Sequence, residues 1–161
     1  MSRAPFQILV LPYKIGPKNV IRYAIFARSD SKNCWQGIAG GGEGKETLLS
    51  AAKREAHEEA GINTASKYIK LDSLTTLPVV NVCGFKWGAR VLVIPEYSFG
   101  VEIKDQPIKL SREHSGFKWV SYDEAMKKLK WDSNRNALWE LNYRLRQKPF
   151  RTRLKRGGLI A

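Results

Sequence analysis

The alternation of strand-like and helix-like segments predicts an α/β domain, in which helices pack on the faces of a β-sheet. Size and composition support this fold class: the chain has 161 residues, and 43% of them are hydrophobic. Such a chain can bury one hydrophobic core without help from disulfides or bound metals, and it is too apolar for a disordered protein. We find no internal repeat and no linker, so we expect one domain over residues 1–147 and a basic tail over residues 148–161.

Segments rich in apolar and β-branched residues, bounded by turn residues such as Gly16, Gly84 and Gly88, have the composition of β-strands. A cluster of glycines at residues 40–44 interrupts this pattern, and we expect it to form a loop. The strands are expected over residues 6–13, 20–28, 68–82, 90–97 and 116–120.

Other segments carry apolar residues at helical spacing. The first helix is expected to begin after Thr47, which can cap it, and to run to Ala60, because Gly61 is a natural stop. Further helices are expected over residues 122–129 and 133–147. One stripe of the first helix should pack against the sheet, and it comprises Leu49, Ala52, Ala56 and Ala60.

The balance of charges favours an anionic partner. The 28 Lys and Arg residues outnumber the 15 Asp and Glu residues, which gives a formal charge of +13. A nucleotide, a phosphorylated metabolite and nucleic acid all qualify. No acidic residue follows Glu140, so RNA binding is one interpretation of the C-terminal stretch. A solvated basic end is the simpler one, because no RNA-binding motif with interleaved aromatic residues is present.

The small number of cysteines and the short apolar runs indicate in which cellular compartment the protein works. Cys34 and Cys83 are too few for a disulfide framework, which favours a reducing environment, and we interpret both as small buried or half-buried side chains. The longest early apolar run, residues 8–11, is far too short for a signal peptide or a membrane span. We therefore expect a cytoplasmic protein with no membrane partner.

Three carboxylates share one face of the first helix. Glu55, Glu58 and Glu59 stand at i, i+3 and i+4, next to the apolar stripe. Like charges at this spacing repel one another, whereas carboxylate oxygens are the ligands that Mg²⁺ and Mn²⁺ prefer. Glutamate runs on helices usually form a solvated face, so the neighbouring residues decide between a surface and a metal site.

Those neighbours resemble the Nudix box at every fixed position. The box is a glycine, a glutamate six positions later, and then Arg-Glu-aliphatic-x-Glu-Glu-x-Gly-aliphatic, which here are Gly40, Glu46 and residues 54–62. Ala56 is smaller than the usual aliphatic residue but fits a buried position. The resemblance implies a Nudix-type α/β/α sandwich with a mixed β-sheet between helices. It also implies a metal-dependent hydrolase of nucleoside diphosphates linked to another group.

The resemblance assigns roles within the box. It implies that Glu55, Glu58 and Glu59 bind a divalent cation, Mg²⁺ or Mn²⁺, and that Glu58, Glu59 and Arg54 form the catalytic set. Arg54 would orient a box carboxylate, and Glu46 would brace the loop before the helix. The general base would be one of the box carboxylates or a glutamate outside the box.

Further segments extend the resemblance. Residues 35–41 match the approach to the box glycine, and residues 113–120 look like a second signature, in which an acid precedes a strand ending in Trp. With residues 133–137 they are similar to the dihydroneopterin triphosphate pyrophosphatases, a branch that also hydrolyses some deoxynucleoside triphosphates such as dATP. His114 is interpreted as an ordinary strand-edge histidine. The implied additional contacts are Glu113 for the metal, and Arg3, Arg28, Ala39, Gly40 and Asn134 for the substrate.

The expected reaction is Mg²⁺-dependent cleavage of a nucleoside or pterin triphosphate to the monophosphate and pyrophosphate. One alternative is an ADP-ribose or dinucleoside polyphosphate hydrolase, for which Pro78 is a weak indication. Another is an RNA 5′-end pyrophosphohydrolase or RNA-binding protein. A Nudix binding module without catalysis is disfavoured, because no box carboxylate is missing.

Overall fold

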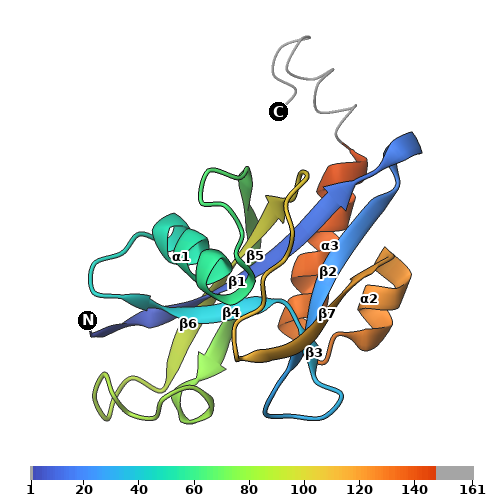
Figure 1. The fold of residues 1–161 in the computed structure, drawn as a ribbon. Coiled ribbons are helices and arrows are strands. Elements are labelled where there is room, and N and C mark those ends of the chain that lie inside the picture. The colour runs from blue at the N-terminus through green and yellow to red at the C-terminus, as the bar shows by residue number, and fades with distance from the viewer. Residues whose placement is uncertain (1, 148–161) are drawn as a thin grey trace.

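A computed structural model describes residues 2–147, and the basic tail expected at residues 148–161 lies outside them. The described residues form one mixed sheet with helices on both faces (Figure 1). The strands are β1 (Arg3–Ile15), β2 (Ile21–Arg28), β3 (Trp35–Gln36), β4 (Ile38–Glu43), β5 (Tyr68–Pro78), β6 (Val93–Glu102) and β7 (His114–Val120). The helices are α1 (Leu48–Ala60), α2 (Tyr122–Lys128) and α3 (Asp132–Arg146), with 3₁₀ turns at Pro17–Asn19 and Val79–Asn81.

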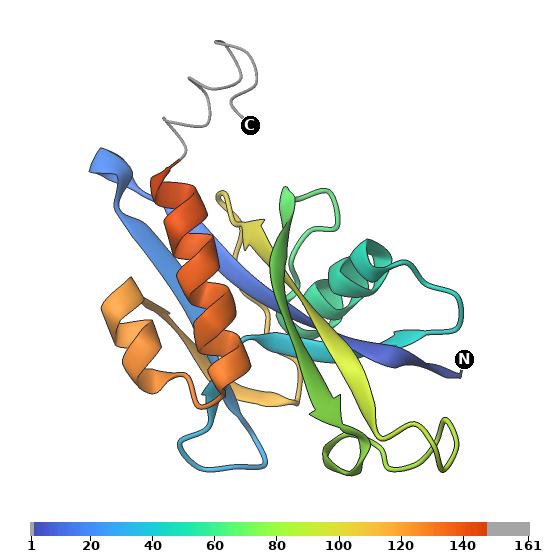
Figure 2. The same ribbon diagram turned by 180° about the vertical axis from the view of Figure 1, so that it is seen from behind.

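Strand β1 organises the sheet. It pairs in parallel with β6, and antiparallel with β4 along its first part and with β2 at its end. β5 adds an edge beyond β6, while β3 and β7 both pair with β2. Helix α1 lies on one face of this sheet, and α2 and α3 lie on the other, which Figure 2 shows from behind. The predicted α/β/α sandwich with a mixed sheet is therefore confirmed.

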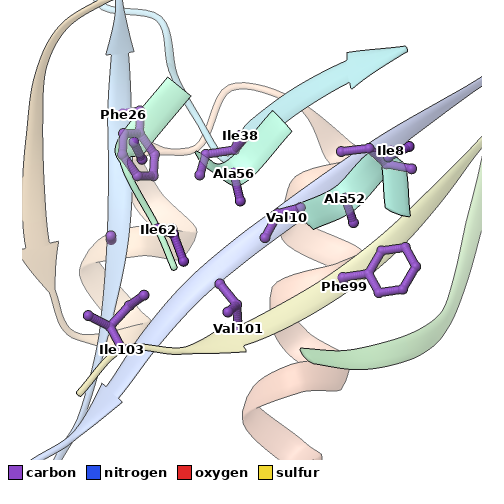
Figure 3. Close-up of a cluster of buried hydrophobic side chains, with 13 residues drawn as sticks. Ile8, Val10, Phe26, Ile38, Ala52, Ala56, Ile62, Phe99, Val101 and Ile103 are labelled. Carbon is purple, nitrogen blue, oxygen red and sulfur yellow. The ribbon is translucent and has the colours of Figure 1, made fainter. Parts of the chain in front are cut away.

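The alternation of side chains along β1 explains the two apolar layers. Ile8 and Val10 point into the cluster beneath α1, and Leu9 and Leu11 point into the cluster beneath α2 and α3. Figure 3 shows the first cluster, in which alanines of α1 meet side chains of the sheet. Because β1 is buried on both faces, its sequence reads as a continuous apolar run.

Helix α1 has the predicted ends. The Thr47 side chain accepts a hydrogen bond from the Ser50 backbone N–H at 3.1 Å, and Gly61 ends the helix with a φ of 66°. The buried face, however, differs from the predicted stripe. Leu49 is 42% exposed, whereas Ala51 and Glu59 are buried. The face of α1 that contacts the sheet is therefore turned away from Leu49 and includes Glu59, although a carboxylate is usually exposed to solvent.

The remaining differences concern strand ends and loops. The glycine cluster expected to be a loop lies mostly in β4, where Gly41 pairs with Gln7 of β1. β6 continues beyond the expected end at residue 97 to Glu102, because its later residues still pair with β1. Cys34 is buried as expected, but Cys83 is exposed in the loop before β6. Among residues 2–147, no helix is long and apolar enough to cross a membrane.

The two helix faces can be compared by matched leucine truncations. Leu141 of α3 is fully buried, so Leu141→Ala should lower the free energy of unfolding by about 2–5 kcal/mol. Leu49→Ala, at the position that sequence reasoning placed in the core, should change it by less than about 0.5 kcal/mol. Urea denaturation followed by circular dichroism measures both. Equal losses would show that Leu49 is buried after all.

Candidate active site

Strand β4 offers α1 a backbone surface without side chains. A Cβ atom on Gly40 would lie 2.1 Å from the carboxyl carbon of Glu55, so only glycine leaves room for this carboxylate. On the next residue, a Cβ atom on Gly41 would lie 2.3 Å from the guanidinium carbon of Arg3. Successive residues of a strand face opposite sides, so Glu55 and Arg3 approach β4 from its two faces.

The Arg54 guanidinium joins α1 to β4. Its Nη2 donates a hydrogen bond to the Gly41 carbonyl oxygen at 2.8 Å, and its Nε donates to Oε1 of Glu46 at 2.8 Å. Its Nη1 donates to Oε1 of Glu55 at 2.9 Å and to Oε2 of Glu58 at 3.1 Å. One cation therefore fixes three carboxylates relative to the glycine strand, and planar guanidinium groups suit such multiple contacts.

Glu46 braces the loop between β4 and α1. Its Oε2 accepts a hydrogen bond from the Glu43 backbone N–H at 2.8 Å, and both of its oxygens accept from Arg54. The hydrogen bonds from Arg54 hold the pKa of the Glu46 carboxyl below its ordinary value, and the same contact raises the pKa of Arg54. Both groups therefore stay ionised at neutral pH.

Glu59 lies deeper than the other box glutamates. It is 3% exposed, and its Oε2 lies 2.7 Å from Nε2 of His114, the first residue of β7. Burial raises the pKa of the Glu59 carboxyl, and the hydrogen bond with His114 opposes that rise. His114 is itself buried, so this pair is shielded from water on both sides.

The site carries more negative charge than its cations balance. Burial raises the pKa of Glu55 to about 7; Arg54 opposes this rise, and the charges of Glu59 and Glu58 add to it. A carboxylate whose ionised form is disfavoured in this way gains from a nearby cation. Carboxylate oxygens are also the donors that a hard divalent ion prefers. The chemistry of this set of residues therefore fits a divalent metal.

The carboxylates do not, however, converge as they stand. Across the described part of the chain, no three His, Cys, Asp or Glu side chains form a group that could hold a metal ion. The hydrogen bonds explain why, since Arg54 holds Glu55 and Glu58, and His114 holds one oxygen of Glu59. The metal-ligand roles of these glutamates accordingly stay predictions.

The NUDIX domain family model matches residues 21–140, a stretch that includes β4, α1 and the whole acidic site. The chain belongs to the Nudix family. As a Nudix hydrolase it acts on phosphoanhydride bonds, as the sequence predicted. Members of the family generally use a divalent metal such as Mg²⁺.

Individual relatives agree with this assignment. A curated relative, dihydroneopterin triphosphate diphosphatase of Haemophilus influenzae, is 25% identical over 143 residues, or 87% of this chain and 89% of that protein. A structure assigned to the NUDIX hydrolases of Listeria monocytogenes is 37% identical, with a TM-score of 0.82 over 90% of this chain and 97% of the other. The dihydroneopterin triphosphate pyrophosphohydrolase of E. coli is 26% identical, with a TM-score of 0.71 over 87% and 97%.

Arg3, predicted to contact substrate, is half-buried and belongs to a chain of polar side chains on the α3 face of the sheet. Its Nη2 donates to Oε1 of Gln7 at 3.0 Å, and Nε2 of Gln7 donates to Oε2 of Glu96 at 3.0 Å. Glu96 is 4% exposed, and burial raises the pKa of its carboxyl. Oε1 of Glu96 and Nε of Arg3 are buried, and within the described part of the chain neither has a hydrogen-bond partner.

Arg28 and Glu113 lie together at the end of β2. Arg28 forms an ion pair with Asp30 and lines an open pocket of about 250 Å³ with Lys32 and Trp35. Glu113 is exposed, and the Ser29 backbone N–H donates to its carbonyl oxygen at 2.9 Å. Its charge contributes to the raised pKa of Glu59, so Glu113 lies near the Nudix carboxylates even though it is not hydrogen-bonded to them.

Ala39, Gly40 and Asn134 occupy different environments. Ala39 and Gly40 are neighbours on β4, paired with Leu9 and Ile8 of β1. Asn134 of α3 is 3% exposed, and its Oδ1 accepts a hydrogen bond from the Gly37 backbone N–H at 2.8 Å. Its side chain thus holds the connection between β3 and β4 and stands apart from Glu55, which approaches Gly40 from α1.

Sequence reasoning missed three polar residues that the structure makes prominent, namely His114, Gln7 and Glu96. His114 was interpreted as a strand-edge residue, yet it is buried against Glu59. Glu96 and Ser98 alternate with apolar residues of β6, a pattern that could have shown one polar face. The predicted strand over residues 90–97 includes Glu96 but leaves out Ser98, so the alternation is incomplete within it.

The close approach at Gly40 can be tested separately from folding. In Gly40→Ala the three atoms nearest to the new Cβ all belong to the flexible end of Glu55, so we expect the carboxylate to move while the core stays packed. We expect hydrolysis to fall at least about tenfold, because a small displacement of a site residue is costly, with little change in the melting temperature. Gly116→Ala, where a Cβ meets nothing within 4 Å, is the matched control. Unchanged hydrolysis by Gly40→Ala would show that the position of Glu55 is unimportant.

Proposed function

We propose that this Nudix hydrolase is an Mg²⁺-dependent pyrophosphohydrolase that cleaves a nucleoside or pterin triphosphate to the monophosphate and pyrophosphate. The observation that carries the proposal is the acidic face of α1, where Glu55, Glu58 and Glu59 outnumber the one guanidinium, that of Arg54, bonded to them in the described residues. A cation-binding acidic patch in a chain of formal charge +13 suits a polyphosphate held between a metal and basic side chains.

The substrate class is supported by the two dihydroneopterin triphosphate enzymes among the relatives, at 25% and 26% identity. Both align over most of this chain and most of their own length, so the likeness is not confined to the Nudix box. A triphosphate ester of a pterin or purine nucleoside fits this class, and dATP is the purine member that the sequence resemblance suggests.

The residues of the site have different proposed roles. Glu55, Glu58 and Glu59 would hold the cation, and Glu113, whose charge adds to the raised pKa of the Glu59 carboxyl, would join them. When bound, Mg²⁺ neutralises phosphate charge and favours attack by water. Arg54, through Gly41 and the carboxylates, keeps the helix and the glycine strand in one arrangement.

The reaction adds water across one phosphoanhydride bond. A water oxygen bonds to one of the two phosphorus atoms that share the oxygen between the α- and β-phosphates, the bond from that phosphorus to the bridging oxygen breaks, and the chain separates into monophosphate and pyrophosphate. The attacking water gives up its proton to one of the carboxylates, and the monophosphate ester remains. Arg28 and Arg3 are the proposed contacts to the anionic substrate, together with Ala39, Gly40 and Asn134.

A hydrolysis panel tests the proposed function. The full chain should release pyrophosphate from dihydroneopterin triphosphate or dATP in the presence of Mg²⁺. Chelation by EDTA should abolish this release, and added Mg²⁺ should restore it. ADP-ribose, dinucleoside polyphosphates and 5′-triphosphorylated RNA serve as comparison substrates. Activity confined to those three, or activity that survives chelation, would contradict the proposal.

Glu58→Gln tests the acidic face directly. The Glu58 side chain is 55% exposed, so its neutralisation should leave the fold and melting temperature nearly unchanged. Loss of one carboxylate from a metal site should lower turnover by orders of magnitude, measured as pyrophosphate released per second at saturating substrate. Glu124→Gln, an exposed glutamate on α2, is the control and should retain full turnover. A Glu58→Gln variant with the turnover of the wild-type chain would remove this residue from the proposed metal set.

A further inference from the structure

The environment of His114 is unusual for an edge-strand histidine. Its side chain is 2% exposed, and its ring packs on Phe26 with 5.2 Å between the ring centroids. Nε2 lies 2.7 Å from Oε2 of Glu59. Nδ1 is buried and has no hydrogen-bond partner among residues 2–147. The imidazole therefore has a single polar contact, and that contact is a Nudix-box carboxylate.

A β-bulge turns His114 toward α1. Residues 117 and 119 of β7 pack against the cluster beneath α1, and Val120 packs on the opposite side. Simple alternation would place residue 114 on the side of Val120, away from Glu59. The register with β2 shifts between the Ala27–Gly116 and Arg28–His114 pairs, which inserts one extra residue into β7. Such a bulge reverses the side on which the next side chain lies.

The backbone around His114 is anchored independently of its imidazole. The Ser111 backbone N–H donates to the Glu59 carbonyl oxygen at 3.0 Å, and the Lys109 backbone N–H donates to that of Ala60 at 2.9 Å. On the other side, Ser29 of the β2 end is bonded to Glu113. The segment that leads into β7 is thus hydrogen-bonded to both the end of α1 and the end of β2. These backbone hydrogen bonds hold His114 next to Glu59.

The lack of a partner at Nδ1 indicates which nitrogen of the imidazole carries the proton. A proton on Nδ1 would be a buried donor without an acceptor, which is costly, whereas a bare Nδ1 leaves only an acceptor unused. Of the two tautomers, the one with the proton on Nε2 is therefore favoured, and its Nε2–H donates to Oε2 of Glu59. Because the bond uses Oε2, it fixes the carboxylate while Oε1 stays outside this contact.

We propose that His114 is a positioning residue for the metal site of the proposed function, on which this inference rests. Through its hydrogen bond at 2.7 Å it holds the Glu59 carboxylate in a fixed orientation on the face of α1 that carries Glu55 and Glu58, where a divalent cation would bind. Groups that hydrogen-bond to metal ligands commonly set metal affinity by about 10–100-fold. His114 does not itself contact the metal or the substrate.

Mn²⁺ binding to the full chain tests this inference, with free Mn²⁺ measured by electron paramagnetic resonance in the absence of substrate. His114→Gln retains an N–H donor that reaches about as far as Nε2, and it should bind Mn²⁺ within about threefold of the wild-type chain. His114→Asn is one methylene shorter and His114→Leu has no donor, so both should bind about 10–100-fold more weakly. The Gln and Asn pair decides the matter even where the Leu variant does not fold.

His57 provides the matched control. It is the only other histidine of the chain, lies on α1 two residues before Glu59, and is exposed. His57→Leu should bind Mn²⁺ like the wild-type chain. Hydrolysis by His114→Asn should recover as the metal concentration is raised, with the substrate KM unchanged, which a general loss of structure would not allow.

The outcomes are distinguishable. A wild-type chain that binds no Mn²⁺ overturns the proposed function and this inference with it. A wild-type chain that binds Mn²⁺, with His114→Asn binding equally well, overturns the inference alone. Equal weakening of the folded Gln and Asn variants overturns it too, because the N–H donor would then not be what matters.

Discussion

The contact between Arg54 and the Gly41 carbonyl oxygen is the constraint on which the site depends. It is the point where α1, which carries the carboxylates, is bonded to the glycine strand. The same guanidinium holds Glu46 of the intervening loop, so loop, helix and strand share one cation. The side chain of Arg54 is only 20% exposed, which limits competition from water and makes these hydrogen bonds stronger than those of a surface pair.

The buried face of α1 must satisfy two demands at once. Ala51, Ala52, Ala56 and Ala60 are small enough to bring the helix axis close to the sheet. Glu55 and Glu59 lie on the same side and are drawn into an environment that disfavours their charge. The bare backbone of β4 makes space for one of them, and His114 provides a hydrogen-bond donor for the other. Close packing of the helix is therefore what desolvates the carboxylates.

Short sequence patterns predicted those features of the site that depend only on residues close together in the chain. The Thr47 cap and the Gly61 stop fixed the ends of α1, because both depend on backbone geometry within a few residues. The Nudix box indicated which carboxylates matter, although their metal roles stay predictions. The role of Leu49 was mispredicted because a helical pattern of alanines and glutamates leaves the centre of the buried face ambiguous. His114 could not be found from sequence, because its inward direction comes from a one-residue register shift between β2 and β7.

Strand β4 also separates two residues of the proposed site. Glu55 reaches the strand at Gly40 from the α1 face, and Arg3 reaches it at Gly41 from the α3 face, next to Gln7 and Glu96. In the described residues β4 pairs with β1 alone, so its other edge is not covered by a strand. In the proposed function, a cation on Glu55 and the guanidinium of Arg3 both hold the anionic substrate. Because the two side chains approach β4 from opposite faces, a substrate that reaches both of these proposed contacts would have to pass this edge of the strand.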